Sequence, residues 1–220
     1  MSTNERSNSL KKRRLERERK FRRDAIIKIA EKFFISKGYA QTMVDKIADE
    51  AGYSKATIYN YFESKDDLFI AVASNAFQKL HQTFERTLTQ PDVSYELRSL
   101  GDAYLIFIEE YPDYAAFFDP SRLSLAIRNM IKKEETNQSL TESEKEFRYH
   151  QLKIEELMKN IILETLTKAG ISDKLDPFSV IMALSTLDSA IRELLLREKS
   201  REYVDVLFNI IDKGLKNYDD

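Results

Sequence analysis

Hydrophobic side chains recur at helical spacing through the first third of the chain. The first amphipathic run repeats at i, i+3, i+4 and i+7 and consists of Ile26, Ile27, Ile29, Ala30, Phe33 and Phe34. Lys37-Gly38 is expected to end this helix, because glycine suits the left-handed position after a helix. A second stripe consists of Val44, Ile47, Ala48 and Ala51, and Gly52 interrupts it. A third apolar run, from Leu68 to Phe84, predicts a long helix.

Three hydroxyl residues stand where these helices are expected to begin. Thr42 precedes the second stripe with Asp45 three residues later, and Ser64 precedes the long helix with Asp67 three residues later. Both pairs are close to the capping-box pattern, and Ser54 is a further N-cap candidate. Residues 24–63 therefore form three short helices with very short connections, which leaves no room for an active-site loop.

The rest of the chain also predicts helices and no strands. They are expected near residues 93–110, 120–133, 141–169, 176–198 and 202–217, with Pro112, Pro120, Gly170 and Pro177 between them. This gives an all-α protein of about nine helices. Residues 132–146 carry almost no apolar side chain and are predicted to be a solvated loop.

Charge is distributed unevenly along the 220 residues. The net charge is −2, yet residues 1–23 hold ten Lys or Arg against three Glu, a balance of +7. The first 69 residues sum to +5 and the remaining 151 to −7. This asymmetry suggests that the N-terminal end meets a polyanion. A disordered, solubilising tail is the alternative. Residues 1–9 are expected to be disordered, and residues 10–23 either extend a helix or remain a loose arm.

Several chemistries find no support in the composition. The chain has no Cys, which excludes disulfides and thiolate sites, and His81 and His150 fit no metal-binding spacing. No GxGxxG or P-loop motif indicates a nucleotide. No apolar run approaches the ~18 residues of a membrane span. We therefore expect a cytoplasmic protein that is not an enzyme and has no metal, cofactor or membrane partner.

Residues 25–70 resemble the TetR family of transcriptional regulators. Two short capped helices separated by Ala51-Gly52-Tyr53 suit a helix-turn-helix, whose second helix reads the major groove. The matching residues are Gly38-Tyr39, Thr42, Val44, Ile47-Ala48, Ala51-Gly52, Ser54 to Phe62 and Ser64 to Leu68. The resemblance implies a basic arm at 1–23, a DNA-binding domain at 24–70 and a helical domain for effector binding and dimerisation at 71–220.

The resemblance also implies which side chains meet DNA. The expected contacts to phosphate, sugar or bases come from Thr42, Ser54, Lys55, Ala56, Thr57, Tyr59, Asn60, Tyr61 and Lys65. Free N–H groups at a helix N-terminus bind phosphate, and Lys adds salt-dependent attraction. The alternatives are that Ser54 only caps its helix, that Tyr61 only packs and that Asn60 is only solvated. The basic residues 11–23 either contact a groove or the DNA backbone, or add only general attraction.

The larger domain is interpreted from the family and the hydrophobic pattern. The last two helices, at 176–217, are expected to form a homodimer interface, because residues 178–196 are apolar around most of the helix. The alternative is that this helix is buried within one subunit. Five aromatic residues and one methionine of the middle helices suit an apolar effector and are Tyr104, Phe107, Tyr111, Phe118, Phe147 and Met158. For each residue taken singly, ordinary core packing is the favoured alternative.

The leading hypothesis is a repressor of a palindromic, double-stranded operator that a small, mainly apolar effector releases. Two other classes remain open. A helical interaction module would not depend on Lys55 or Tyr59, and an all-helical enzyme would depend on His150 or a carboxylate. The intact pattern of Tyr59 to Phe62 and Lys65 argues against the interaction module. The lack of a catalytic group of residues argues against the enzyme.

Overall fold

A computed structural model describes residues 3–88, 97–115, 120–168 and 170, together with residues 202, 205, 206, 209 and 213. Throughout these residues the regular structure is helical, which confirms the predicted all-α class. The eight helices of this part are α1 (Thr3–Gln41), α2 (Val44–Ala51), α3 (Lys55–Tyr59), α4 (Lys65–Leu88), α5 (Leu97–Glu110), α6 (Pro112–Ala115), α7 (Pro120–Glu135) and α8 (Glu142–Lys168). The predicted helix at 176–198 lies outside the described residues, as does most of 202–217.

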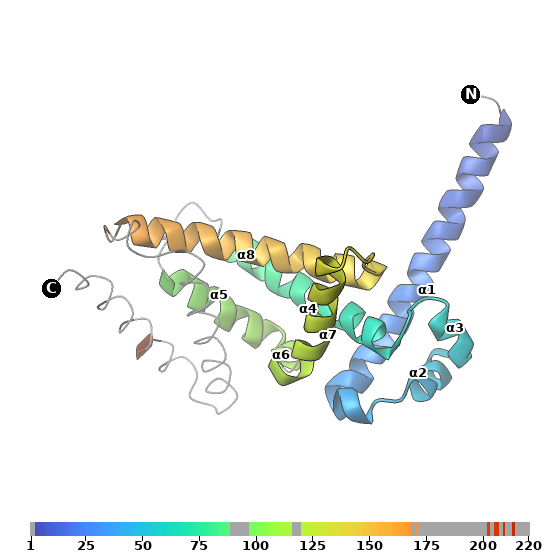
Figure 1. The fold of residues 1–220 in the computed structure, drawn as a ribbon, viewed down its shortest axis with the longest axis horizontal. Coiled ribbons are helices and arrows are strands. Elements are labelled where there is room, and N and C mark those ends of the chain that lie inside the picture. Colours follow the sequence, from blue (N-terminus) through green and yellow to red (C-terminus); the bar gives the residue numbers. More distant parts are fainter. Residues whose placement is uncertain are drawn as a thin grey trace.

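The first helix is far longer than the hydrophobic pattern predicts. It begins at Thr3, where a disordered start was expected, so the basic segment extends a helix. Its N-terminal part projects from the body of the molecule (Figure 1). Near the other end, Gly38 has a positive φ of 73° and breaks the helical geometry, which confirms the predicted interruption there. Residues 39–41 then complete one further turn.

The turn between α2 and α3 depends on a left-handed glycine. Gly52 has φ 69° and ψ 27°, a conformation that costs side-chain-bearing residues about 1–2 kcal/mol. Its N–H donates to the Asp49 carbonyl at 3.2 Å, and the Tyr53 N–H donates to the Ala48 carbonyl at 2.9 Å. These two bonds satisfy the last carbonyls of α2 and turn the chain sharply into α3.

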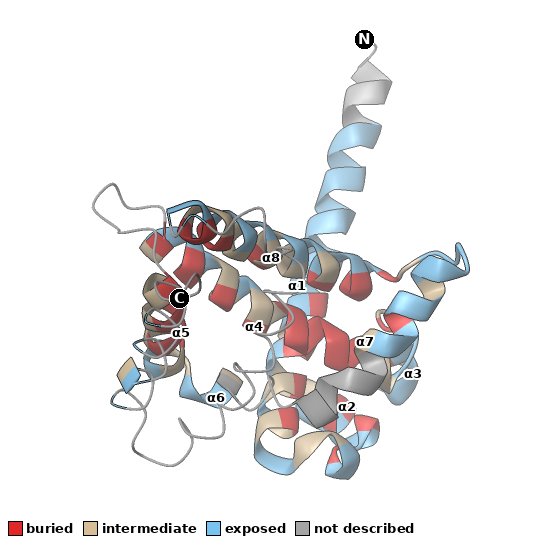
Figure 2. Ribbon diagram, turned by 60° about the vertical axis from the view of Figure 1, so that its left-hand side comes forward, coloured by how far each residue is buried: buried red, intermediate tan, exposed pale blue. Residues whose placement is uncertain are grey.

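The fourth helix is the structural centre of the described residues. It packs against α1 at one end and against α5 and α8 along its length. Buried residues gather where α4, α5 and α8 face one another, whereas the projecting part of α1 is exposed (Figure 2). Phe77 of α4 and Phe147 of α8 pack with ring centroids 4.5 Å apart. Helix α4, which follows α2 and α3, is thus also the central helix around which α5 and α8 pack.

The predicted solvated loop at 132–146 is wrong. Helix α7 continues to Glu135 and α8 begins at Glu142, so only a short connection remains. Thr141, Ser143 and Glu144 are buried although they are polar. Most other residues of the segment are exposed. A count of apolar residues cannot distinguish the three buried polar side chains, which form hydrogen bonds, from these exposed ones.

The two histidines, distant in sequence, meet between α4 and α8. Their Nδ1 atoms are 3.2 Å apart, and burial, followed by the charge of His81, lowers the pKa of His150 from its usual 6.5. The unfolded chain therefore binds more protons as the pH falls below 6.5, and acidification favours unfolding. We expect urea unfolding to show a larger loss of stability between pH 7.5 and pH 5.5 for the wild type than for His150→Gln. Equal losses in the two proteins would contradict this assignment.

Candidate nucleic-acid interface

Helix α3 has one buried face and one exposed face. Ile58 is 1% exposed and packs into the core with Phe62. The opposite face carries the predicted contacts Lys55, Ala56, Tyr59 and Asn60, all exposed. Residues four apart on a helix share a face, so Lys55 lies beside Tyr59 and Ala56 beside Asn60. The structure thus brings these four predicted DNA contacts together on one surface.

The start of α3 is fixed by the predicted cap. Ser54 Oγ accepts a hydrogen bond from the Thr57 N–H at 3.1 Å, which confirms Ser54 as the N-cap. The hydroxyl of Thr57 lies 2.9 Å from the same oxygen. Thr57 is half-buried, at the edge of the exposed face. The cap fixes the first turn of α3, and the N-terminal residues of a recognition helix are the ones that contact base edges.

Lys55 is held close to an acid of the preceding helix. Its Nζ lies 3.0 Å from Asp45 Oδ2, and both side chains are more than half exposed. This hydrogen bond and the charge of Asp45 raise the pKa of Lys55. An exposed pair of this kind is weak, so a phosphate can replace the carboxylate at little cost.

Tyr61 sits at the boundary between the interface and the protein. It is half-buried and packs against the core, while the Arg19 Cζ lies 6.0 Å from its ring centroid. Packing therefore accounts for part of this side chain. Its expected DNA contact stays a prediction.

The predicted cap at Thr42 is wrong. The N-cap of α2 is Met43, which makes no side-chain capping bond. Thr42 is 1% exposed, and its hydroxyl points at the carbonyls of Gly38, at 2.7 Å, and Phe33, at 3.1 Å. The threonine therefore ties the end of α1 to α2. A phosphate contact would require these bonds to break, so we leave Thr42 out of the proposed interface.

Lys65 opens α4 and lies against an aromatic ring. Its Nζ is 4.3 Å from the ring centroid of Tyr39, and burial lowers its pKa. The hydroxyl of Tyr39 donates to Asp66, and burial together with this bond raises the pKa of the tyrosine. Ser64 accepts from the Asp67 N–H at 3.1 Å, which confirms the third predicted cap. The predicted phosphate clamp is thus held at a capped helix N-terminus.

A buried arginine connects these N-terminal helices to α8. Arg23 of α1 is 5% exposed, and its Cζ lies 5.5 Å from the ring centroid of Phe62. Its Nη2 donates to Ser143 Oγ at 3.0 Å and also lies 3.0 Å from Glu146 Oε2. The basic pattern of residues 10–23 places Arg23 in the arm and hides this role, which only the tertiary arrangement reveals.

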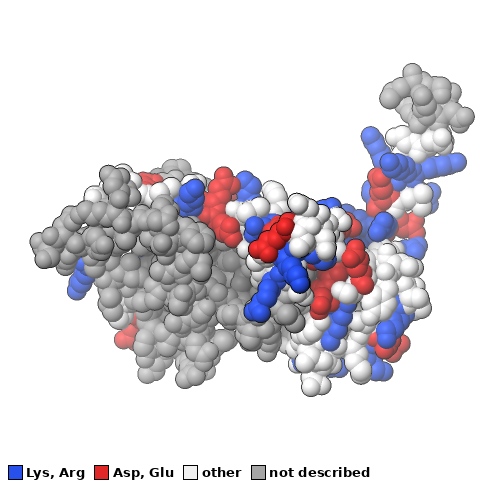
Figure 3. Space-filling view, in the orientation of Figure 1, with Lys and Arg blue, Asp and Glu red and all other residues white. Residues whose placement is uncertain are grey.

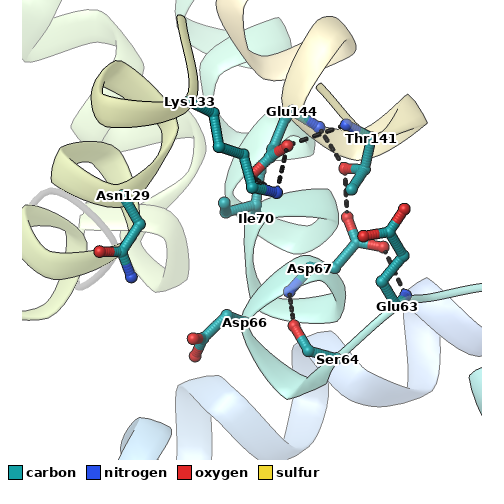
Figure 4. A pocket seen from close by; sticks show the side chains of 9 residues that line it. All are labelled: Glu63, Ser64, Asp66, Asp67, Ile70, Asn129, Lys133, Thr141 and Glu144. Atoms are coloured by element: carbon teal, nitrogen blue, oxygen red, sulfur yellow. Dashed lines mark hydrogen bonds and ion pairs between the residues drawn. The ribbon is translucent and has the colours of Figure 1, made fainter. Parts of the chain in front are cut away.

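A second connection runs from the start of α4 to the start of α8 (Figure 4). Asp67 accepts from the Thr141 hydroxyl at 2.5 Å and from the Glu63 N–H at 2.9 Å. Thr141 and Glu144 cap α8 reciprocally, with bonds of 2.8 and 3.2 Å. Lys133 of α7 donates to both oxygens of Glu144 at 2.9 and 3.0 Å. A T-x-x-E pattern in the sequence announces this cap and could have corrected the predicted loop.

The same residues line a polar pocket of about 180 Å³. It lies between the N-terminal end of α4, α7 and the start of α8, and its wall includes Asp66 and Asn129 (Figure 4). Its polar wall does not suit the apolar effector that the sequence predicts.

The five predicted effector residues that the structure describes form two groups, one on or just after α5 and one on α8. Tyr104 and Phe107 are buried on α5, with Tyr111 half-buried just after it. Their rings follow one another, with centroids 6.2 and 5.7 Å apart. Phe147 is buried against Phe77, and Met158 is half-buried farther along α8. Phe118 lies outside the described residues.

The helix-turn-helix region and the whole chain were compared with known proteins. Residues 26–72 match the family model "Bacterial regulatory proteins, tetR family". The transcriptional activator FasR of Mycolicibacterium smegmatis is 35% identical over 89 residues, which are 40% of this chain and 41% of that protein. The fatty acid metabolism regulator protein of Bacillus subtilis is 23% identical and matches 85% of this chain and 90% of its own.

Solved structures share the fold. The regulator FadR from Bacillus subtilis, in complex with stearoyl-CoA, superposes with a TM-score of 0.57 at 18% identity and covers 87% of this chain and 96% of its own. Residues 26–72, which include α2 and α3, are thus similar to the TetR family of bacterial regulatory proteins, and the chain shares its fold with the solved regulator.

Neither a metal cluster nor a membrane span occurs among the described residues. They include no group of three or more His, Cys, Asp or Glu that could hold a metal ion. Of the helices in that same part of the chain, none has the length and hydrophobicity needed to span a membrane.

Proposed function

We propose that the chain represses transcription as a homodimer that binds a palindromic operator and releases it when a fatty acyl compound binds. The observation that carries the DNA-binding part is the exposed face of α3. Its four residues Lys55, Ala56, Tyr59 and Asn60 point away from a core that holds Ile58 at 1% exposure. A rigid helix with an unpacked outer face is what the major groove accepts. We assign the reader to residues 24–70 and effector binding and dimerisation to 71–220.

The chemistry of the effector is proposed from the relatives and from this chain's own residues. One relative is named for fatty acid metabolism, and the FadR neighbour holds stearoyl-CoA. The aromatic side chains of α5 and the Phe77–Phe147 pair offer apolar walls suited to an acyl chain. We propose that residues 176–217 form the dimer interface, because the sequence of residues 178–196 is apolar around most of a helix.

The route from effector to reader is proposed to pass through the start of α8. Arg23 and Asp67 both bond to this end of the helix, and one belongs to α1 and the other to α4. A displacement of α8 would therefore move both helices that hold the reader. Two readers in a dimer must match major grooves about 34–36 Å apart, so a small rotation weakens binding.

Selection of bound sequences from a random duplex pool, at roughly 0.15 M salt, tests the DNA-binding part. We expect a palindrome with one half-site for each protomer. Recovery of no motif, with only salt-sensitive binding, would reduce the N-terminal region to a nonspecific basic surface and would favour the interaction-module hypothesis.

Titration of the selected operator complex with stearoyl-CoA tests the effector. We expect operator affinity to fall about 5-fold to 150-fold, the usual range of allosteric coupling. Free coenzyme A is the control and should leave the affinity unchanged. If acyl-CoA strengthens operator binding, repression by release is wrong while sequence-specific binding stands, and no response at any chain length would remove the fatty acyl effector.

A further inference from the structure

The projecting part of α1 is a helix with no side packed against the protein. Every residue from 8 to 22 is exposed, and Leu10, Leu15 and Phe21 are 60–75% exposed. These three do not repeat at i, i+3 or i+4, so they form no apolar stripe for a partner helix or a lipid surface. Apart from these three side chains the exposed surface of residues 8–22 is polar or charged, so charge is the main feature that it offers a partner.

The charge of this segment is strongly positive. The exposed stretch 10–22 carries eight Lys or Arg and two Glu. Glu18 accepts from Arg22 at 2.5 Å within the same helix, so this acid is already engaged. Like charges three or four positions apart, such as Arg13 with Arg17, destabilise an isolated helix. Neutralisation by a polyanion removes this repulsion, and blue side chains line the projecting helix in Figure 3.

The arm is joined rigidly to the reader. Helix α1 runs without a break from the exposed segment to Ile26 and Ala30, which are both fully buried. Arg19 lies 6.0 Å from the ring centroid of Tyr61, which follows α3 closely in the chain. The arm therefore leaves the body at the end of the molecule that carries α2 and α3 (Figure 1). Thirteen helical residues, 10–22, extend about 20 Å, well over half of one turn of B-DNA.

We propose that the exposed part of the basic arm, residues 8–22, is a second DNA-binding surface that contacts phosphates of the duplex flanking the operator, without reading its sequence. The inference rests on the proposed function, because the arm can flank an operator only if α3 binds one. It takes its support from charge complementarity and from the continuity of the arm with the reader. Each phosphate neutralised by Lys or Arg releases counterions, which makes the contact strongly dependent on salt.

The test compares two full-length variants of equal charge change. The arm variant carries Lys11→Gln, Lys12→Gln and Lys20→Gln, because Gln keeps helix propensity. The control carries Lys132→Gln, Lys159→Gln and Lys168→Gln, which are exposed lysines of α7 and α8. Affinity is measured by fluorescence anisotropy over a range of salt concentrations, on a duplex holding only the selected operator and on one with ten further base pairs on each side.

The expected result is weaker binding to the flanked duplex only. The arm variant should bind it at least about tenfold more weakly, and the slope of log K against log salt should fall by roughly one for each phosphate that the arm no longer neutralises. The control variant should match the wild type in both respects, and the arm variant should select the same operator motif. Circular dichroism checks that the arm remains helical.

Other outcomes overturn the inference in distinguishable ways. If the slope of log K against log salt is unchanged in the arm variant, the arm does not contact phosphates of the duplex. If regulation in cells is impaired as well, the arm binds another macromolecule. A changed operator motif would show that the arm reads bases. Failure of the wild type to select any motif would refute the proposed function, and the arm would then have no operator to flank. Deletion of residues 1–18 gives an independent measurement of the same slope.

Discussion

Replacing Tyr59 with alanine is expected to weaken operator binding by about 5-fold to 150-fold, as removal of an interaction of about 1–3 kcal/mol predicts. Tyr59 is 42% exposed at the centre of the outer face of α3. Both protomers of a symmetric dimer lose the side chain, which enlarges the effect on the complex. The free energy of unfolding should change by less than about 0.5 kcal/mol, because an exposed side chain contributes little to the core.

Two controls make this measurement specific. Tyr149 of α8 is 55% exposed, and Tyr149→Ala should leave operator affinity unchanged. Tyr59→Phe keeps the ring and removes the hydroxyl, so it separates a phosphate hydrogen bond from packing on sugar or a thymine methyl group. If Tyr59→Ala binds the operator as tightly as the wild type, α3 does not present this face to DNA, and the assignment of the reader fails.

Lys55 is expected to behave differently from Tyr59 in salt. Lys55→Gln should reduce the salt slope by about one for each half-site, as a phosphate contact does. Asp45→Asn should raise operator affinity, because it removes the acid that holds Lys55 at 3.0 Å and would face the DNA phosphates. Lower affinity of Asp45→Asn would show that the acid positions the lysine for DNA.

Sequence reasoning succeeded where the determining interactions are local. Ser54 and Ser64 cap the helices they precede, and Gly52 occupies the left-handed turn, because each effect acts over only a few residues. These predictions require no knowledge of distant segments.

The errors fall where the same residue type serves two purposes. Thr42 satisfied the pattern of a cap, yet its hydroxyl is taken by carbonyls of the preceding helix. The stretch 132–146 has few apolar residues, yet Thr141, Ser143 and Glu144 within it are buried and form hydrogen bonds. The basic pattern of residues 10–23 places Arg23 in the exposed arm, because its partner Ser143 lies 120 residues away in the sequence. Periodicity reports on apolar burial and carries no information on such polar contacts.

The predicted homodimer interface and part of the predicted effector site stay predictions. Residues 176–198 and Phe118 lie outside the described residues. The described aromatic residues are distributed over α4, α5 and α8, and sequence spacing alone could not show that Phe77 meets Phe147 across two helices. A helical period determines which face of one helix is buried, whereas the pairing of faces depends on the whole packing arrangement.

The largest loss of stability is expected from Asp67→Ala. Asp67 is 6% exposed, and its carboxylate accepts from the Thr141 hydroxyl and the Glu63 N–H. Removal of this acceptor leaves a buried hydroxyl without that partner, so the free energy of unfolding should fall by about 2–4 kcal/mol. Asp49→Ala, at a 71% exposed aspartate of α2, is the control and should change it by less than about 0.5 kcal/mol.

A double-mutant cycle with Thr141→Val decides whether the effect arises from the connection between α4 and α8. Urea unfolding is followed at one fixed protein concentration, because the stability of a dimer depends on concentration. The two substitutions should be non-additive by roughly 1–2 kcal/mol if the Asp67–Thr141 bond is formed. Thr141→Val should also reduce the change in operator affinity caused by stearoyl-CoA, because it cuts one of the two links from α8 to the reader. Strict additivity together with an unchanged response would show that this bond neither stabilises the protein nor transmits the effector signal, and Arg23 would then be the remaining link to α8.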